Sequence, residues 1–155
     1  MNYWLMKSEG SCYSIDDLKK DGRTAWEGVR NFQARNFMER DMKVGDMVLF
    51  YHSSSNPSGV YGLAKVVSAA HADLSALDPK DEHYDPKSTK EKPIWTCVDV
   101  GFVEKFKEPL SLGQIKLRPK LSCMIILRKG SRLSITPVSK SEFEDVLKAA
   151  GSAIL

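Results

Sequence analysis

Two short apolar segments on either side of a serine-rich loop constrain the fold most strongly. Residues 47–51 read Met-Val-Leu-Phe-Tyr and are almost wholly apolar, which is typical of a strand buried on both faces. Residues 60–67 resume as a strand, with small Gly62 and Ala64 on one face where another element packs close or a barrel bends. The pattern predicts a β-hairpin that closes through the loop 52–59.

Three further segments predict more strands. Residues 2–7 place Tyr3, Leu5 and Lys7 on one face and Trp4 and Met6 on the other, and 94–106 and 132–136 follow a period of two residues. In the longest, one face is expected to carry Ile94, Val98, Val100, Phe102 and Phe106. Trp95 falls on the opposite face. We therefore expect Trp95 either to face a cleft or to be covered by a helix.

Short helices are expected between these strands. Serine or asparagine caps precede them at Ser14, Asn31, Ser111 and Ser139. The sequence pattern of residues 121–127 fits either a helix or a strand. The polar segment 68–93 is long for a loop without secondary structure, and loops of this length are usually functional or partly helical. These elements predict a single α+β domain over residues 1–155, with a mainly antiparallel, barrel-like sheet flanked by short helices.

Composition narrows the class of protein without naming a function. Of the 155 residues, 42% are hydrophobic and 28% charged, close to globular averages, and the net charge of +3 permits nucleic-acid binding without arguing for it. No apolar run reaches the roughly 18 residues of a membrane span, and the first residues do not resemble a secretory signal. We expect an intracellular protein, cytoplasmic or nuclear, that does not bind membranes.

The metal-binding residue types are scattered. Three cysteines are widely spaced with no Cys-x-x-Cys pair, and the three histidines His52, His71 and His83 lack metal-ligand spacing. The sequence predicts reduced thiols, no metal and no cofactor.

Residues 26–40 combine a candidate site with its support. If Asn31 caps a helix, that helix buries one face formed by Ala34, Phe37, Met38 and Met42. Trp26 precedes the helix and is separated from it by Gly28. Its ring therefore need not share the buried face and can line a cleft.

Several long motifs, in order along the chain, resemble one family. They are Tyr-Trp-Leu-Met-Lys-Ser-Glu at 3–9, Trp-Glu-Gly-Val-Arg-Asn-Phe-Gln-Ala-Arg-Asn at 26–36, Lys-Val-Gly-Asp at 43–46, Phe-Tyr-His-Ser at 50–53, Tyr-Asp-Pro-Lys-Ser at 84–88 and Arg-Lys-Gly-Ser-Arg-Leu-Ser at 128–134. Together they resemble the EVE domain over nearly the whole chain. One departure is Gly10-Ser11-Cys12 after Glu9, where the family usually has proline, so a more mobile first loop is expected.

That resemblance implies a PUA-like fold, a small curved β-barrel flanked by helices, related to the YTH domain that captures N6-methyladenine in an aromatic cage. It also implies a reader of modified bases in DNA or RNA, with modified cytosine a leading candidate. Such a reader holds a base against aromatic rings while polar groups read its edge.

The residues expected at this base pocket are aromatic, polar or close to the glycine hinge. They are Trp26, Trp95, Tyr84, Ser8, Glu9, Gly28, Val29, Asn31, Tyr51, His52 and Ser53. Lys7, Arg30 and Arg35 are candidate phosphate contacts. Simpler alternatives are core packing for each tryptophan, a helix cap for Asn31, and ion pairs with Glu27 or Glu39 for the arginines.

Two other function classes remain open. A hydrolase would use His52 beside Ser53, with Asp46, Glu9 or Glu27 as partners, but no G-x-S-x-G elbow surrounds the serine. A generic PUA-like module would bind RNA or protein without reading a modification. The preferred hypothesis is a non-catalytic module whose partner is nucleic acid carrying a modified base.

Overall fold

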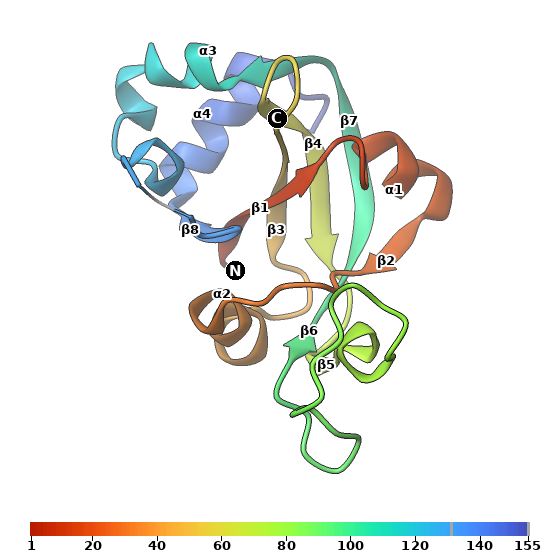
Figure 1. Cartoon of the computed structure of the whole chain (residues 1–155). Helices are drawn as coiled ribbons and strands as arrows, with labels where there is room; N and C mark the ends of the chain where they lie inside the picture. The colour runs from red at the N-terminus through yellow and green to blue at the C-terminus, as the bar shows by residue number, and fades with distance from the viewer. Residues whose placement is uncertain (131, 155) are drawn as a thin grey trace.

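A curled six-stranded sheet organises the computed structural model, which describes residues 1–130 and 132–154 (Figure 1). Its strand order is β2-β7-β4-β3-β1-β8. The strands are β1 (Tyr3–Glu9), β2 (Arg23–Ala25), β3 (Met47–Ser53), β4 (Gly59–Val66), β7 (Asp99–Ser111) and β8 (Ile135–Val138). The β1–β3 pair is parallel and the other pairs are antiparallel. The sheet forms a half-barrel, so the predicted α+β class with a curved, mainly antiparallel sheet is confirmed.

The predicted hairpin is the antiparallel pair β3–β4 at the centre of this sheet. Side chains of β3 alternate between two hydrophobic clusters, with Phe50 in one and Leu49 and Tyr51 in the other. Both faces of the strand are therefore buried, as its apolar sequence predicted.

Short helices begin at the predicted caps. α1 (Ile15–Asp21), α3 (Leu112–Lys116) and α4 (Lys140–Ala150) each open with a reciprocal capping box at the preceding serine. α2 (Phe32–Asn36) continues into a π-helical turn, η1 (Phe37–Asp41), and the Asn31 side chain accepts a 3.0 Å hydrogen bond from the Ala34 N–H. The expected apolar stripe packs inward, because Ala34, Met38 and Met42 are buried and Phe37 lies against the core.

The expectation of one strand over 94–106 is wrong. β6 (Thr96–Cys97) pairs with β5 (His71–Ala72) in a separate small sheet, and β7 begins at Asp99. The backbone changes partners at Val98, whose carbonyl accepts the Trp26 N–H at 2.9 Å, while Ser68 Oγ accepts the Asp99 N–H at 2.8 Å. Alternation of side chains continued through the break and did not reveal it.

Two other expectations need correction. The last strand starts at Ile135, three residues later than predicted, although the Ser134 carbonyl already accepts the Lys7 N–H at 2.8 Å. Within 121–127, the structure has short 3₁₀ turns, η3 (Pro119–Leu121) and η4 (Ile125–Leu127), rather than one helix or strand.

The polar segment 68–93, with the two residues that follow it, forms a lobe (residues 68–95) below the half-barrel and beside α2 (Figure 1). It contains β5 and a 3₁₀ helix, η2 (Leu74–Leu77), so the expectation of partial helix is confirmed. In the part of the chain that the structure describes, no helix is long and apolar enough to cross a membrane.

Candidate functional site

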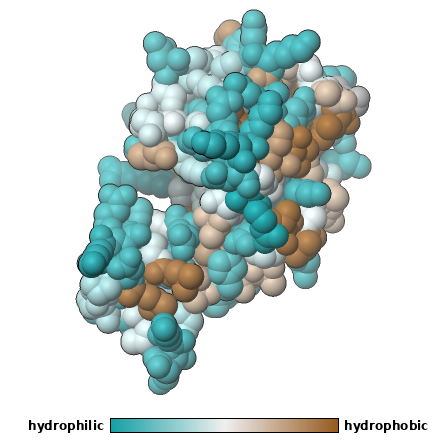
Figure 2. All heavy atoms as spheres, turned by 90° about the vertical axis from the view of Figure 1, so that its right-hand side faces the viewer, coloured by the Kyte–Doolittle hydropathy of each residue, from teal (hydrophilic) through white to brown (hydrophobic). Residues whose placement is uncertain are grey.

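A cavity of about 350 Å³ opens where the end of β1 meets β2 and the approach to α2. It is lined by Lys7, Ser8, Tyr13, Thr24, Ala25, Trp26, Glu27, Gly28, Val29, Arg30 and Ser134. Figure 2 shows a mostly hydrophilic face whose outline is hollowed between the upper part of the molecule and the lower lobe. A cavity of this size lies at the lower end of the range for small-ligand sites, about 300–1,000 Å³.

Trp26 is one of two aromatic residues that line the cavity, the other being Tyr13. Its ring meets Phe50 edge-on, with centroids 5.5 Å apart and planes at 84°, and only 8% of the residue is exposed. The indole N–H forms no hydrogen bond within residues 1–130 and 132–154. Trp26 therefore belongs to both the core and the cavity, so core packing and a place at the pocket, the two alternatives given for it in the sequence analysis, are both observed.

Polar groups with unused hydrogen-bonding capacity line the other walls. The Ser8 hydroxyl donates to the Tyr13 carbonyl at 2.8 Å, which leaves its oxygen lone pairs as acceptors. Lys7 is half-buried, and burial lowers the pKa of its ammonium group. Neither Lys7 nor Glu27 has an ion-pair partner within 4.0 Å in the described part of the chain, so the cavity offers both a donor and an acceptor.

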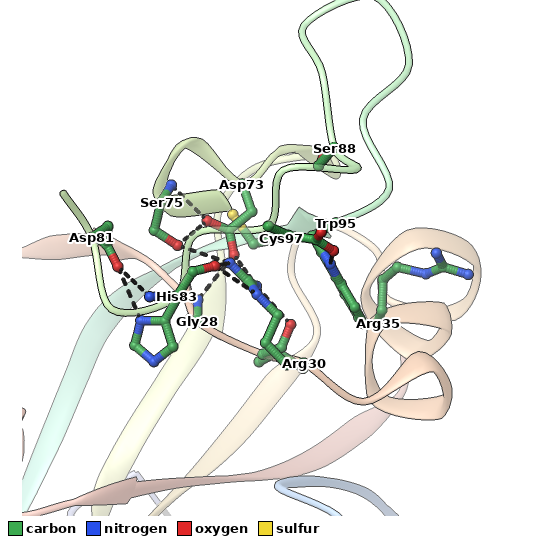
Figure 3. A network of polar contacts seen from close by, with 12 residues as sticks. Gly28, Arg30, Arg35, Asp73, Ser75, Asp81, His83, Ser88, Trp95 and Cys97 are labelled. Carbon is green, nitrogen blue, oxygen red and sulfur yellow. Dashed lines mark hydrogen bonds and ion pairs between the residues drawn. The ribbon is translucent and has the colours of Figure 1, made fainter. Parts of the chain in front are cut away.

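Asp73, which sequence reasoning missed, fixes the backbone of this wall. Its buried carboxylate accepts hydrogen bonds from the Gly28 N–H at 2.9 Å, from Arg30 at 2.9 Å and from the N–H and hydroxyl of Ser75 (Figure 3). Burial alone would raise the pKa of Asp73, but the hydrogen bonds from Ser75, Gly28 and Arg30 outweigh it and lower the pKa. An anionic carboxylate thus ties the lobe to the cavity wall.

Arg30 lies within this network rather than facing solvent. Its guanidinium donates to Asp73, Ser75, the Val29 carbonyl and, twice, the His83 carbonyl, at 2.7 to 3.2 Å. Five bonds use all five N–H groups of a guanidinium. Its ion-pair partner is Asp73, not the expected Glu27, and the arrangement leaves no donor for the predicted phosphate contact.

Gly28 is required at its position for two reasons. Its φ of +87° lies in the region that favours glycine, and a Cβ there would come within 2.9 Å of His83 Cε1. The ring of His83 therefore lies directly against the backbone of the cavity wall.

Trp95 and Tyr84 do not line the cavity. The Trp95 indole N–H donates to Asp85 at 2.7 Å, and its ring stacks on Phe32 of α2 with centroids 4.8 Å apart and planes at 18°. Of the two expectations for Trp95, the covering helix is the one observed. Tyr84 is 40% exposed on the lobe.

Other predicted pocket residues lie elsewhere. Tyr51 belongs to the hydrophobic cluster on the sheet face opposite Phe50, where burial raises its pKa. Asn31 caps α2, Glu9 is exposed, and the Ser53 carbonyl accepts the Ser55 hydroxyl at 2.9 Å.

His52 has a structural role at the start of α1. Its Nε2 accepts the Ile15 N–H at 3.0 Å, and its ring stacks on Tyr61 with centroids 3.8 Å apart. Burial is the main reason why its pKa is lowered. The nitrogen that a hydrolase would use as a base is therefore occupied by the backbone.

Arg35 also makes mainly internal contacts. It donates to the Ile94 carbonyl at 2.8 Å and to the Asn36 side chain, and it pairs with Glu39 at 3.6 Å, as one alternative expected.

Among the predicted site residues, the fold brings Lys7, Ser8, Trp26, Gly28, Val29 and Arg30 to one cavity. It adds Tyr13, Thr24, Ala25, Glu27 and Ser134, which were not predicted at the base pocket. Glu27 could have been found by its adjacency to Trp26. Within the described residues, no group of three or more His, Cys, Asp or Glu side chains could hold a metal ion.

The fold is that of an EVE domain. The EVE domain family model matches residues 2–149, and the chain belongs to this family. It is 41% identical to thymocyte nuclear protein 1 of Gallus gallus, over 94% of this chain and 67% of that protein. The Homo sapiens protein of the same name is 38% identical, over 94% and 72% of the two chains.

Solved structures show the same fold. A hypothetical protein from Leishmania major superposes with a TM-score of 0.93 at 46% identity, over 100% of this chain and 98% of that one. Human THYN1 in complex with 5-methylcytosine-containing DNA superposes with a TM-score of 0.89 at 37% identity, over 97% and 98%.

Proposed function

We propose that this protein is a non-catalytic nucleic-acid-binding module that captures a modified nucleobase in the cavity beside Trp26. The observation that carries the proposal is the meeting of an aromatic wall with unpaired polar groups in one cavity of about 350 Å³. Base–aromatic stacking contributes about 1–3 kcal/mol per base, and polar edge contacts discriminate among bases.

Modified cytosine in DNA is the first candidate ligand. Cytosine presents an N4 amino donor beside its N3 and O2 acceptors, and carboxylates accept from N4 at protein–DNA interfaces. Glu27 supplies such a carboxylate, while Lys7 supplies a donor for the acceptor side of the same edge. The structure of human THYN1 with 5-methylcytosine-containing DNA also supports this choice.

The assignment is binding rather than turnover. The His52 Nε2 accepts the Ile15 N–H, so this imidazole would have to give up a helix contact to act as a base. Asp73 and Arg30 act as positioning residues that hold the cavity wall. The relatives named thymocyte nuclear protein 1 favour the nucleus over the cytoplasm as the place where this module works.

Paired oligonucleotides test the proposal. A DNA strand with one 5-methylcytosine and its unmodified twin are titrated against the protein, and the panel is extended to other modified bases and to RNA. We expect at least one modified oligonucleotide to bind more tightly than its unmodified twin. Equal affinity for every twin pair would overturn it and leave a generic PUA-like module.

A further inference from the structure

Phe32 is an exposed aromatic residue that the cavity does not use. Although it is the first residue of α2, 58% of it is exposed. Its ring stacks on Trp95, which is only 6% exposed. Phe32 is thus the outer layer of a two-ring stack whose inner layer is buried.

Two contacts hold Trp95, the inner ring of the stack, in place. The Trp95 indole N–H donates to Asp85 at 2.7 Å, and the Arg30 guanidinium carbon lies 5.2 Å from the centroid of the Trp95 ring. Because Arg30 also lines the cavity, the stack begins one side chain away from the cavity wall.

The face of Phe32 that is turned away from Trp95 is not covered by this stack, and 58% of the residue is exposed. Arg35 lies 4.8 Å from the Phe32 centroid but also only 5.8 Å from that of Trp95. A guanidinium directly above the face of Phe32 that is turned away from Trp95 would lie at about twice the distance between the two ring centroids from Trp95. Arg35 therefore lies to one side of the stack, within cation–π distance of both rings, and places a positive charge next to the exposed Phe32.

We propose that the outer face of Phe32 is a second binding surface, on which the base next to the captured one stacks. A flat ring with a cation at its edge is suited to the π-face and the neighbouring phosphate of a nucleotide. Each base has such a face, so this contact adds affinity without reading sequence or modification. The inference rests on the proposed function, because it needs a base held in the cavity.

The test combines a protein change with a change in the nucleic acid. The probe is the 5-methylcytosine oligonucleotide, single- or double-stranded, whichever binds tighter, with or without an abasic site beside the modified base. Phe32→Ala should weaken binding by about tenfold for the modified and unmodified twins alike. The abasic neighbour should weaken wild-type binding by a similar factor and Phe32→Ala binding much less.

Two control variants separate stacking from folding and from general hydrophobicity. Phe32→Tyr keeps a ring and should bind like wild type. Leu117→Ala removes another exposed apolar side chain, 83% exposed at the end of α3, and should change nothing. A cooperative thermal unfolding transition is required of each variant as evidence that it is folded. Because most of Phe32 is exposed, its replacement is expected to leave the fold intact.

Wild-type affinity in Phe32→Ala, or an equal loss from the abasic neighbour in both proteins, would overturn the inference. Failure of the proposed function gives a different result, because the modified and unmodified twins would then bind equally to wild type. A drop in the modified-to-unmodified preference in Phe32→Ala would also contradict the inference, since it would place Phe32 at the captured base.

Discussion

The carboxylate of Asp73 accepts a hydrogen bond from the backbone N–H of Gly28 at 2.9 Å, across 45 positions of sequence. This contact joins the lobe formed by residues 68–95 to the wall that carries Trp26. The geometry of the cavity therefore depends on a segment that contributes none of its lining residues.

Replacing Asp73 tests this dependence. Asp73→Asn leaves the half-buried Arg30 without its anionic partner, and loss of one partner from a buried pair costs about 3 kcal/mol. Chemical unfolding followed by tryptophan fluorescence measures the change. Asp78→Asn, an exposed residue of the same lobe, is the matched control, and equal stability of the two variants would contradict a clamp at Asp73.

Gly28→Ala separates backbone strain from the contact with His83. A non-glycine residue at φ +87° costs about 1–2 kcal/mol, and the new Cβ would also clash with the imidazole 2.9 Å away. Gly45→Ala is a control for strain alone, because its φ is +98° and nothing lies within 4 Å of its Cβ. Gly28→Ala should lower the free energy of unfolding more than Gly45→Ala does. An equal loss in both variants would show that the ring of His83 moves aside without reducing stability.

Two histidines predict opposite pH dependences of stability. Burial lowers the pKa of His52 below 6.5, despite Asp16 and Asp17 nearby, so the unfolded chain takes up the proton first. The contribution of His52 is present above about pH 6.5 and is lost as the pH falls through its folded pKa. For His71, burial is outweighed by the hydrogen bond to Asp99, and the pKa is raised. Its contribution is present below about pH 6.5 and is lost as the pH rises through the folded pKa.

Unfolding at pH 5 and pH 8 therefore distinguishes the two sites. Relative to wild type, His52→Gln should lose less stability on going from pH 8 to pH 5, and His71→Gln should lose more. Identical pH profiles for both variants would contradict the assigned environments.

Lys7 is expected to carry the electrostatic part of ligand binding. Of the three predicted phosphate contacts, Arg30 has every donor occupied and Arg35 bonds mainly within the protein. Because Lys7 is proposed as a donor to the base edge, Lys7→Gln should weaken nucleic-acid binding and leave the slope of log affinity against log salt unchanged. Lys19→Gln on the exposed side of α1 is the control. A slope reduced by about one would contradict the base-edge role and assign Lys7 to a phosphate.

The sequence predicted the fold where local rules decide it. Capping boxes set the starts of α1, α3 and α4, and the apolar run 47–51 placed the central strand. The break at Val98 was not predictable in this way, because it depends on the Trp26 N–H, which is distant in sequence. Trp95 was attributed to the pocket because it lies off the apolar face of the predicted strand, although Asp85 and Phe32 hold it in a separate stack.

The residues of the site were likewise predictable where they are close in sequence and not where they depend on distant contacts. Trp26, Gly28 and Arg30 are consecutive enough to suggest one wall, and β1 brings Lys7 and Ser8 to it. Asp73 gave no signal in the sequence, since a single aspartate in a polar segment is usually solvated. Tyr51 was misplaced because its neighbour Phe50 takes the cavity side of the strand, and successive side chains point to opposite faces.

The most direct test of the central claim is the affinity ratio between modified and unmodified oligonucleotides in Trp26 variants. Trp26→Phe keeps an aromatic face against Phe50 and should retain most of the preference. Trp26→Ala, shown to be folded by its unfolding transition, should bind both twins with equal affinity, because the stacking surface is lost. A folded Trp26→Ala protein that still preferred the modified oligonucleotide as strongly as wild type would contradict capture of the base beside Trp26.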